Sequence, residues 1–222
     1  MTAELKNLYE TIIMDNIING IVKDKPELRQ IFDNAPADKK RKLILNFMEE
    51  NNPEHRFMCS AINKIVEANK TGETNHIAGI VRMLREYVHI SDTDVKTMGE
   101  VMTPIELVEE MLDTLPYEVW TNPNLKWLDP CNGVGTFISV VVKRLMKGLE
   151  GFQPVAELRY KHIMENMIYS CELQEKNVFL YMYAFDPKDD YDLNIYCGSY
   201  LSEDFNRHMK FWGIEKFDII VM

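Results

Sequence analysis

Short apolar runs that alternate with helical patterns dominate the second half of the chain, and they constrain its fold more than any other feature. The apolar runs cover residues 125–129, 168–173, 193–197 and 217–222, and helical patterns fill 137–149, 155–167 and 178–185. Strands that alternate with helices along a chain favour a parallel sheet with helices on both of its faces. The sequence therefore predicts an α/β fold from about residue 99 onward.

Residues 1–98 lack this alternation and have helical patterns throughout. An amphipathic pattern that begins near Leu5 predicts a first helix with its stop at Gly20. Another pattern covers residues 73–89, and three more begin after prolines, which a first helical turn tolerates: Pro26, Pro36 and Pro53. We therefore predict an all-helical N-terminal domain at 1–98 and a separate α/β domain at 99–222.

The charge of the chain argues against a domain that grips duplex DNA alone. The net charge is −10, and residues 99–222 carry nearly all of it. Neutralisation of phosphates by basic side chains supplies most non-specific DNA affinity, so any DNA contact must come mostly from elsewhere. The one basic cluster, Lys39-Lys40-Arg41-Lys42, is interpreted as a solvated helix face.

Other features of composition favour a cytoplasmic protein without a metal. No apolar run approaches the roughly 18–20 residues of a membrane span, and the N-terminus has no secretory pattern. The cysteines and histidines are scattered without the spacing of disulfide frameworks or zinc sites. We therefore expect reduced thiols, no bound metal and no membrane contact.

The segment from Trp127 to Phe137 carries the clearest sign of a ligand site. It reads as an apolar strand that ends in Asp129, turns through Gly133 and Gly135, and enters a helix. Glycines let the backbone approach a ligand closely, and a helix N-terminus favours electronegative groups. A dinucleotide site would need a third glycine where Ile138 stands.

The same segment, Asp-Pro-Cys-Asn-Gly-Val-Gly-Thr-Phe, resembles the D-P-x-x-G-x-G-x-F signature of amino-group DNA methyltransferases, above all the adenine-specific enzymes. In that family the loop surrounds the methionine part of S-adenosylmethionine. Upstream, Gly99 to Pro104 resembles the family's G-x-x-x-T-P element, which lines the same pocket. By itself this upstream segment reads as a helix start, with Thr103 as cap, Pro104 in the first turn and Glu106 closing a capping box.

Two later strand ends continue the resemblance. An acid that follows an apolar strand, here Glu172, accepts hydrogen bonds from ribose hydroxyls in nucleotide-binding α/β folds, and Leu173 would contact the adenine ring. Ser199 stands where the family has an aspartate that meets the cofactor's adenine amino group, so the backbone of Tyr200 could make that contact instead. The run 217–222 resembles the strand that leads into the family's Asn/Asp-Pro-Pro-Tyr/Phe catalytic loop, which the 222 residues do not contain.

The resemblance implies a γ-type adenine-specific DNA methyltransferase of a restriction-modification system, represented by its N-terminal part. The implied fold is a Rossmann-like S-adenosylmethionine-dependent methyltransferase fold, incomplete before the catalytic loop, so no catalytic residue is assigned and the chain alone is expected to be inactive. DNA is the expected substrate, with specificity and nuclease subunits as further partners. The implied cofactor-binding residues are Met102, Thr103, Pro104, Asp129, Pro130, Asn132, Gly133, Gly135, Thr136, Phe137, Glu172, Leu173, Ser199 and Tyr200.

Two alternatives remain open at this point. Enzymes that methylate RNA or a protein glutamine share the Asp-Pro loop and the catalytic loop, although the Thr-Pro element favours DNA. The chain could also be a non-catalytic binding module, or one half of a split enzyme whose helical domain docks a partner.

Overall fold

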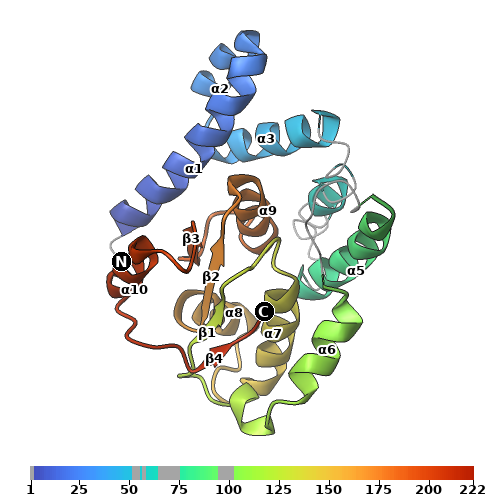
Figure 1. The fold of residues 1–222 in the computed structure, drawn as a ribbon, viewed down its shortest axis with the longest axis vertical. Coiled ribbons are helices and arrows are strands. Elements are labelled where there is room, and N and C mark those ends of the chain that lie inside the picture. The colour runs from blue at the N-terminus through green and yellow to red at the C-terminus, as the bar shows by residue number, and fades with distance from the viewer. Residues whose placement is uncertain (1–2, 52–55, 57–58, 65–75, 95–102) are drawn as a thin grey trace.

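A computed structural model describes residues 3–51, 56, 59–64, 76–94 and 103–222. The described N-terminal part is helical, as predicted, and residues 59–64 are also helical. Its elements are α1 (Ala3–Asp24), the 3₁₀ turn η1 (Pro26–Leu28), α2 (Arg29–Asn34), α3 (Ala37–Asn51) and α5 (His76–Asp94). Figure 1 shows α1, α2 and α3 gathered at one end of the molecule and α5 along its side.

Three local predictions for the helices are wrong. Helix α1 continues past Gly20 to Asp24, because Ile21 is buried and its packing carries the helix onward. Arg41 is not on a solvated face but is buried at 5% exposure, since its guanidinium has partners in the α/β part. Thr103 does not cap α6, because Pro104 is the N-cap, no side chain caps it, and Glu106 pairs with Arg85 instead.

The second half of the chain has the predicted α/β architecture. Its strands form one parallel four-stranded sheet in the order β3-β2-β1-β4. They are β1 (Trp127–Asp129), β2 (Ile168–Glu172), β3 (Asn194–Cys197) and β4 (Ile219–Ile220). The last strand lies beside the first, with Trp127 opposite Ile219 and Leu128 opposite Ile220.

Helices cover both faces of this sheet. They are α6 (Ile105–Asp113), α7 (Thr136–Gly148), α8 (Ala156–Asn166), α9 (Glu175–Phe185) and α10 (Glu203–Trp212), with a 3₁₀ turn η4 (Tyr117–Trp120). Trp127 and Ile168 pack with α7, α8 and α9, whereas their neighbours Leu128 and Tyr169 point to the other face and pack with Phe205 of α10. This alternation follows from the two-residue period of a strand.

The N-terminal helices share their core with the α/β part. Helix α5 contacts α6 and α7, and α1 contacts α9. One continuous cluster of buried apolar side chains includes Ile44 of α3, Leu84 of α5 and Val141 of α7. In the described part of the chain, no helix is long and apolar enough to cross a membrane.

Candidate cofactor site at the carboxyl ends of β1 and β2

The loop that leaves β1 is shaped by two glycines in the left-handed region. Gly133 has φ 54°, and Gly135, the N-cap of α7, has φ 94°. A Cβ on Gly135 would lie 2.7 Å from Cδ2 of Tyr181 and 2.8 Å from Cε2 of Phe185, both on α9. Only glycine fits this position, because the backbone runs directly against an aromatic wall and adopts a conformation that other residues avoid.

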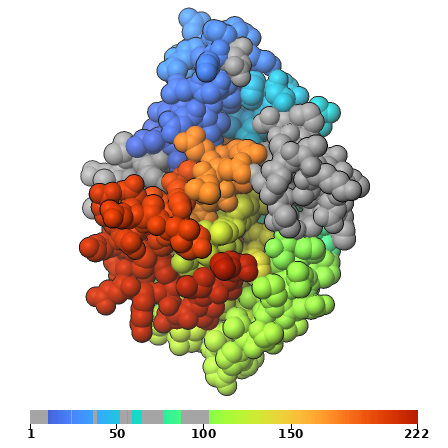
Figure 2. Space-filling model, viewed as in Figure 1, coloured from blue at the N-terminus to red at the C-terminus, as the bar shows by residue number. Residues whose placement is uncertain are grey.

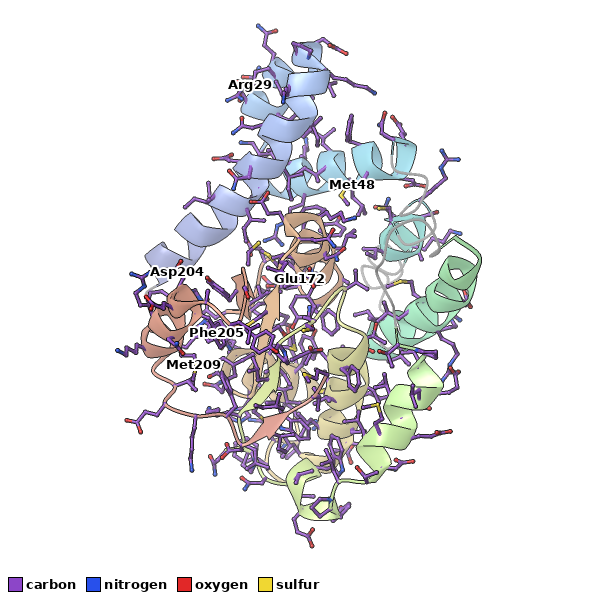
Figure 3. The ribbon with its side chains drawn as sticks, in the orientation of Figure 1. Arg29, Met48, Glu172, Asp204, Phe205 and Met209 are labelled. Carbon is purple, nitrogen blue, oxygen red and sulfur yellow. The ribbon has the colours of Figure 1, made fainter. Side chains whose placement is uncertain are left out.

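Glu172, at the end of β2, connects this loop to its neighbours. Its Oε2 accepts a hydrogen bond from the backbone N–H of Gly133 at 2.8 Å, and its Oε1 accepts one from Gln174 at 2.8 Å. The backbone carbonyl of Glu172 accepts the N–H of Gly198 after β3, also at 2.8 Å. One residue therefore fixes three segments at the same edge of the sheet, near the centre of the molecule in Figure 3.

Asp129 places a second carboxylate beside Glu172. It is 1% exposed, and its Oδ1 accepts the N–H of Cys131 at 3.1 Å. Burial raises the pKa of Asp129 to about 7, against the smaller lowering effect of that hydrogen bond, and the charge of Glu172 raises it further. Among the described residues neither carboxylate forms a salt bridge, so no ion pair within the protein neutralises Glu172, or Asp129 when it is ionised.

Asn132 adds a buried acceptor to the loop. The residue is 3% exposed, its backbone N–H donates to Cys171 at 2.9 Å, and its Nδ2 donates to the carbonyl of Gly133 at 3.2 Å. Its Oδ1 has no hydrogen-bond donor among the described residues. A buried polar atom without a partner costs free energy, so such an atom beside a ligand loop is a candidate contact.

Apolar surface lies next to these polar groups. Leu173 follows Glu172 directly and is 69% exposed, although leucine is among the residues most often buried. In contrast, Pro130, Thr136 and Phe137 of the same loop are buried, and Phe137 belongs to the apolar core. Within the predicted set, Leu173 therefore offers open contact area, whereas Phe137 anchors the start of α7.

The turn after β3 is organised around the start of α10. The carbonyl of Ser199 accepts the N–H of Ser202 at 3.0 Å and its hydroxyl at 2.7 Å. Ser202 in turn caps α10 by accepting the N–H of Phe205. The hydroxyl of Ser199 accepts the N–H of Leu201 at 3.3 Å, and Ser199 and Tyr200 are half-buried. The N–H of Gly198, which donates to the carbonyl of Glu172, joins this turn to the site.

The Thr-Pro element occupies the start of α6, which packs against α7. Thr103 and Pro104 are half-buried, and no hydrogen bond joins them to the 129–137 loop within the described residues. Met102 lies outside the described residues. The assignment of these three residues to the cofactor pocket stays a prediction.

Sequence reasoning missed the wall behind the loop. The rings of Tyr181 and Phe185 are tilted against each other with 4.6 Å between their centroids, and both limit the space at Gly135. Aromatic residues at helical spacing indicate only a buried face, so no sequence signal points from them to the loop. The structure describes no group of three or more metal-ligating side chains that could hold a metal ion.

Comparison with known proteins relates part of the chain to a methylase from another organism. No family model matches the chain. A stretch of 77 residues is 47% identical to a protein of Mycoplasma pneumoniae described as an uncharacterized adenine-specific methylase. That relative is a methylase by description. The match covers 33% of this chain and 18% of the relative, so the chain spans less than a fifth of the relative's length.

Proposed function

We propose that this chain binds S-adenosylmethionine at the carboxyl ends of β1 and β2, as the cofactor-binding part of a Rossmann-like methyltransferase. The observation that carries the proposal is the hydrogen bond from the N–H of Gly133 to Oε2 of Glu172. It joins a glycine loop at a helix N-terminus to an acidic strand end, and nucleotide ligands of open α/β sheets bind at this edge. The strand order, with all four strands parallel, is compatible with that fold.

The residues present fit such a cofactor. Its positive charges would meet the carboxylates of Asp129 and Glu172, which lack protein cations among the described residues. Each oxygen of Glu172 accepts one backbone N–H, and a carboxylate has about four acceptor positions, so capacity remains for ribose hydroxyls. The open face of Leu173 would contact the adenine ring, and Oδ1 of Asn132 could accept an N–H of the ligand. When bound, the cofactor supplies an electrophilic methyl group on a sulfonium.

The finer proposal is methylation of the adenine amino group in DNA, with γ-type motif order, in a restriction-modification context. It is supported by the Asp129–Phe137 signature, the Thr103-Pro104 element and the description of the Mycoplasma relative. DNA, a specificity subunit and a nuclease subunit are the proposed partners. The enzyme would place a flipped adenine next to the sulfonium, where positioning contributes most of the rate.

Titration calorimetry tests cofactor binding directly. We expect heat of binding from S-adenosylmethionine and S-adenosylhomocysteine with the wild-type chain, and no binding of NAD. Asp129→Ala should abolish the signal, whereas Glu118→Ala, an exposed acid on η4, should bind like wild type. Equal heats from the Asp129 and Glu118 variants, or no heat from wild type at millimolar cofactor, would remove the basis of the proposal.

A methyl-transfer assay tests the finer statement. The 222 residues contain no Pro-Pro pair, so no loop of the catalytic type is present to hold a target base. We expect no radiolabel in unmethylated DNA, in RNA or in protein from the purified 222-residue chain. Label in adenine of DNA would show that the catalytic group lies within these residues, and label only in RNA or protein would contradict the proposed substrate.

A further inference from the structure

The N-terminal helices hold α9 at both of its ends. At the first turn of α9, Oε1 of Glu175 accepts a hydrogen bond from Nδ2 of Asn16 on α1 at 2.7 Å. At the last turn, Arg41 of α3 donates to the backbone carbonyl of Asp186 at 3.0 Å. Figure 1 shows α1 and α3 next to α9, and Figure 2 shows the blue and cyan helices against the orange segment that includes α9.

The contact of Arg41 is a buried one. Its side chain is 6% exposed, and its Nη2 lies 2.8 Å from Oδ1 of Asp189. The last carbonyls of a helix have no partner within the helix and carry partial negative charge, so a cation placed there is stabilising. The preceding carbonyl, that of Phe185, accepts the hydroxyl of Tyr160 at 2.7 Å. Side chains from other elements therefore satisfy two successive carbonyls at the end of α9.

Arg41 also fixes the loop that follows α9. Asp189 has φ 63°, the one described residue other than glycine with a positive φ. Such a conformation is uncommon and persists when its surroundings determine it. Its carboxylate pairs with Arg41, while the carboxylate of Asp186 accepts the N–H groups of Asp190 and Tyr191, each at 2.9 Å. Arg41 thus bridges the helix end and the strained residue three positions later.

The last turns of α9 are the turns that carry the aromatic wall of the candidate site. Tyr181 and Phe185 lie 2.7 and 2.8 Å from the position of a Cβ on Gly135, so the loop packs directly against both rings. Phe185 directly precedes Asp186, whose carbonyl Arg41 holds. A shift of the end of α9 would therefore move the wall and the Gly135 loop with it, because close-packed interiors transmit displacement.

We propose that Arg41 is a positioning residue for the cofactor loop, and that the N-terminal helices belong to the scaffold of the site. Arg41 holds the end of α9, α9 holds Gly135, and Gly135 starts α7 and completes the loop above Glu172. The effect of Arg41 on cofactor affinity rests on the proposed function, whereas its effect on the structure of the loop does not.

The test compares four full-length variants: Arg41→Ala, Arg41→Lys, Asp189→Ala and the matched control Arg29→Ala. Arg29 also lies in the N-terminal helices and pairs with Asp33, but that pair is exposed on α2 and far from Glu172 in Figure 3. Amide hydrogen exchange in 131–139 reports on the loop, because the amides of Asn132, Gly133, Gly135 and Ser139 are hydrogen-bonded there. The second readout is the Kd for S-adenosylhomocysteine, measured well below each variant's Tm.

We expect Arg41→Ala to speed exchange in 131–139 and to weaken binding by about tenfold or more, since small misplacements of binding groups are costly. Arg41→Lys should recover part of both losses because it keeps the charge, and Arg29→Ala should match wild type. If Arg41→Ala does not fold, Asp189→Ala tests the inference in its place. The side chain of Asp189 is 42% exposed, so its removal should destabilise the fold less than removal of the buried Arg41 side chain.

Unchanged exchange in 131–139 and unchanged affinity in a folded Arg41 or Asp189 variant would overturn the inference. An equal effect of Arg29→Ala would also overturn it, since the effect would then be general destabilisation. If wild type binds no cofactor, the proposed function fails, and the exchange data still decide whether Arg41 positions the loop.

Discussion

The loop after β1 and the turn after β3 leave the same edge of one parallel sheet, on opposite sides of β2, yet they are held very differently. The β1 loop is fixed from two sides, by the hydrogen bond of Gly133 to Glu172 and by the aromatic wall against Gly135. The β3 turn has a hydrogen bond to Glu172 from Gly198, whereas the bonds of Ser199 and Ser202 lie within the turn or cap α10.

This difference indicates which of the two segments can hold ligand-binding groups in fixed positions. A group that must be placed accurately needs neighbours that fix its backbone and its side chain, as Asp129, Gly133 and Glu172 have. The β3 turn leaves Leu201 at 79% exposure and commits Ser199 to local bonds. We therefore expect the β1 and β2 ends to dominate cofactor affinity, and the β3 turn to contribute little.

The largest expected effect comes from Gly135→Ala. The added Cβ would clash with Tyr181 and would sit at φ 94°, so we expect a loss of about 2–4 kcal/mol in the free energy of unfolding. Cofactor binding should be lost with it. Gly151→Ala is the matched control, since a Cβ there meets nothing within 4 Å. Denaturant unfolding of both variants checks this, and similar stabilities would show that the wall does not constrain the loop.

The next largest effect is expected from Glu172→Gln, which should weaken cofactor affinity by about tenfold and lower the free energy of unfolding by about 1–3 kcal/mol. The glutamine keeps one acceptor oxygen but turns an amide N–H₂ toward one of the two backbone donors, those of Gly133 and Gln174. Calorimetry and unfolding beside Glu118→Gln measure both effects. A variant with the affinity of Glu118→Gln would remove Glu172 from the site.

Asp129→Asn should raise stability and lower affinity at the same time. The pKa of Asp129 is raised by burial from 3.8 to about 7, so the folded protein holds a proton there that the unfolded chain has lost. Stability therefore falls as pH rises from about 4 to about 7, and it stays low above that range. The asparagine removes this penalty, so we expect a gain of at least ~1 kcal/mol at pH 8 that shrinks toward pH 4.

The same substitution should flatten the pH dependence of binding. Ionised Asp129 attracts the cationic cofactor, so wild-type affinity should rise between pH 5.5 and 7.5, whereas Asp129→Asn should bind weakly at both values. Unfolding curves and titrations at these pH values measure the two effects. An asparagine variant that loses stability at pH 8, or that binds as wild type does, would contradict the assignment.

Ser199→Ala should have the smallest effect, less than about threefold in affinity, because its hydroxyl makes only a long bond to the N–H of Leu201. The affinities of Ser199→Ala and Glu172→Gln, measured side by side, test whether the β1 loop and the β3 turn contribute unequally to cofactor binding. A loss equal to that of the Glu172 variant would mean that the β3 turn contributes as much as the β1 loop does.

The strands and the glycine loop could be predicted because their signals are local. Apolar runs fix the positions of β1 to β4, and the glycines at 133 and 135 indicate the turn before α7. Helix α10 was not identified, although Ser202 at its start and Gly213 after its end have the residue types of helix caps.

Long-range contacts explain what the sequence could not indicate. Arg41 stands in a basic run typical of a solvated face, and its partner Asp186 lies 145 positions away. The extension of α1 beyond Gly20 depends on the burial of Ile21, and the roles of Tyr181 and Phe185 depend on how α9 crosses the loop. Such features follow from tertiary packing, which local patterns do not encode.

Amide chemical shifts of the ¹⁵N-labelled chain, titrated with S-adenosylhomocysteine, test the central claim most directly. We predict saturable shifts at Gly133, Gly135 and Leu173, smaller shifts near Ser199, and none on the outer face of α10 around Arg207. Saturation should be absent in Asp129→Ala. Shifts centred away from the carboxyl ends of β1 and β2, or no shifts at millimolar ligand, would contradict the cofactor site.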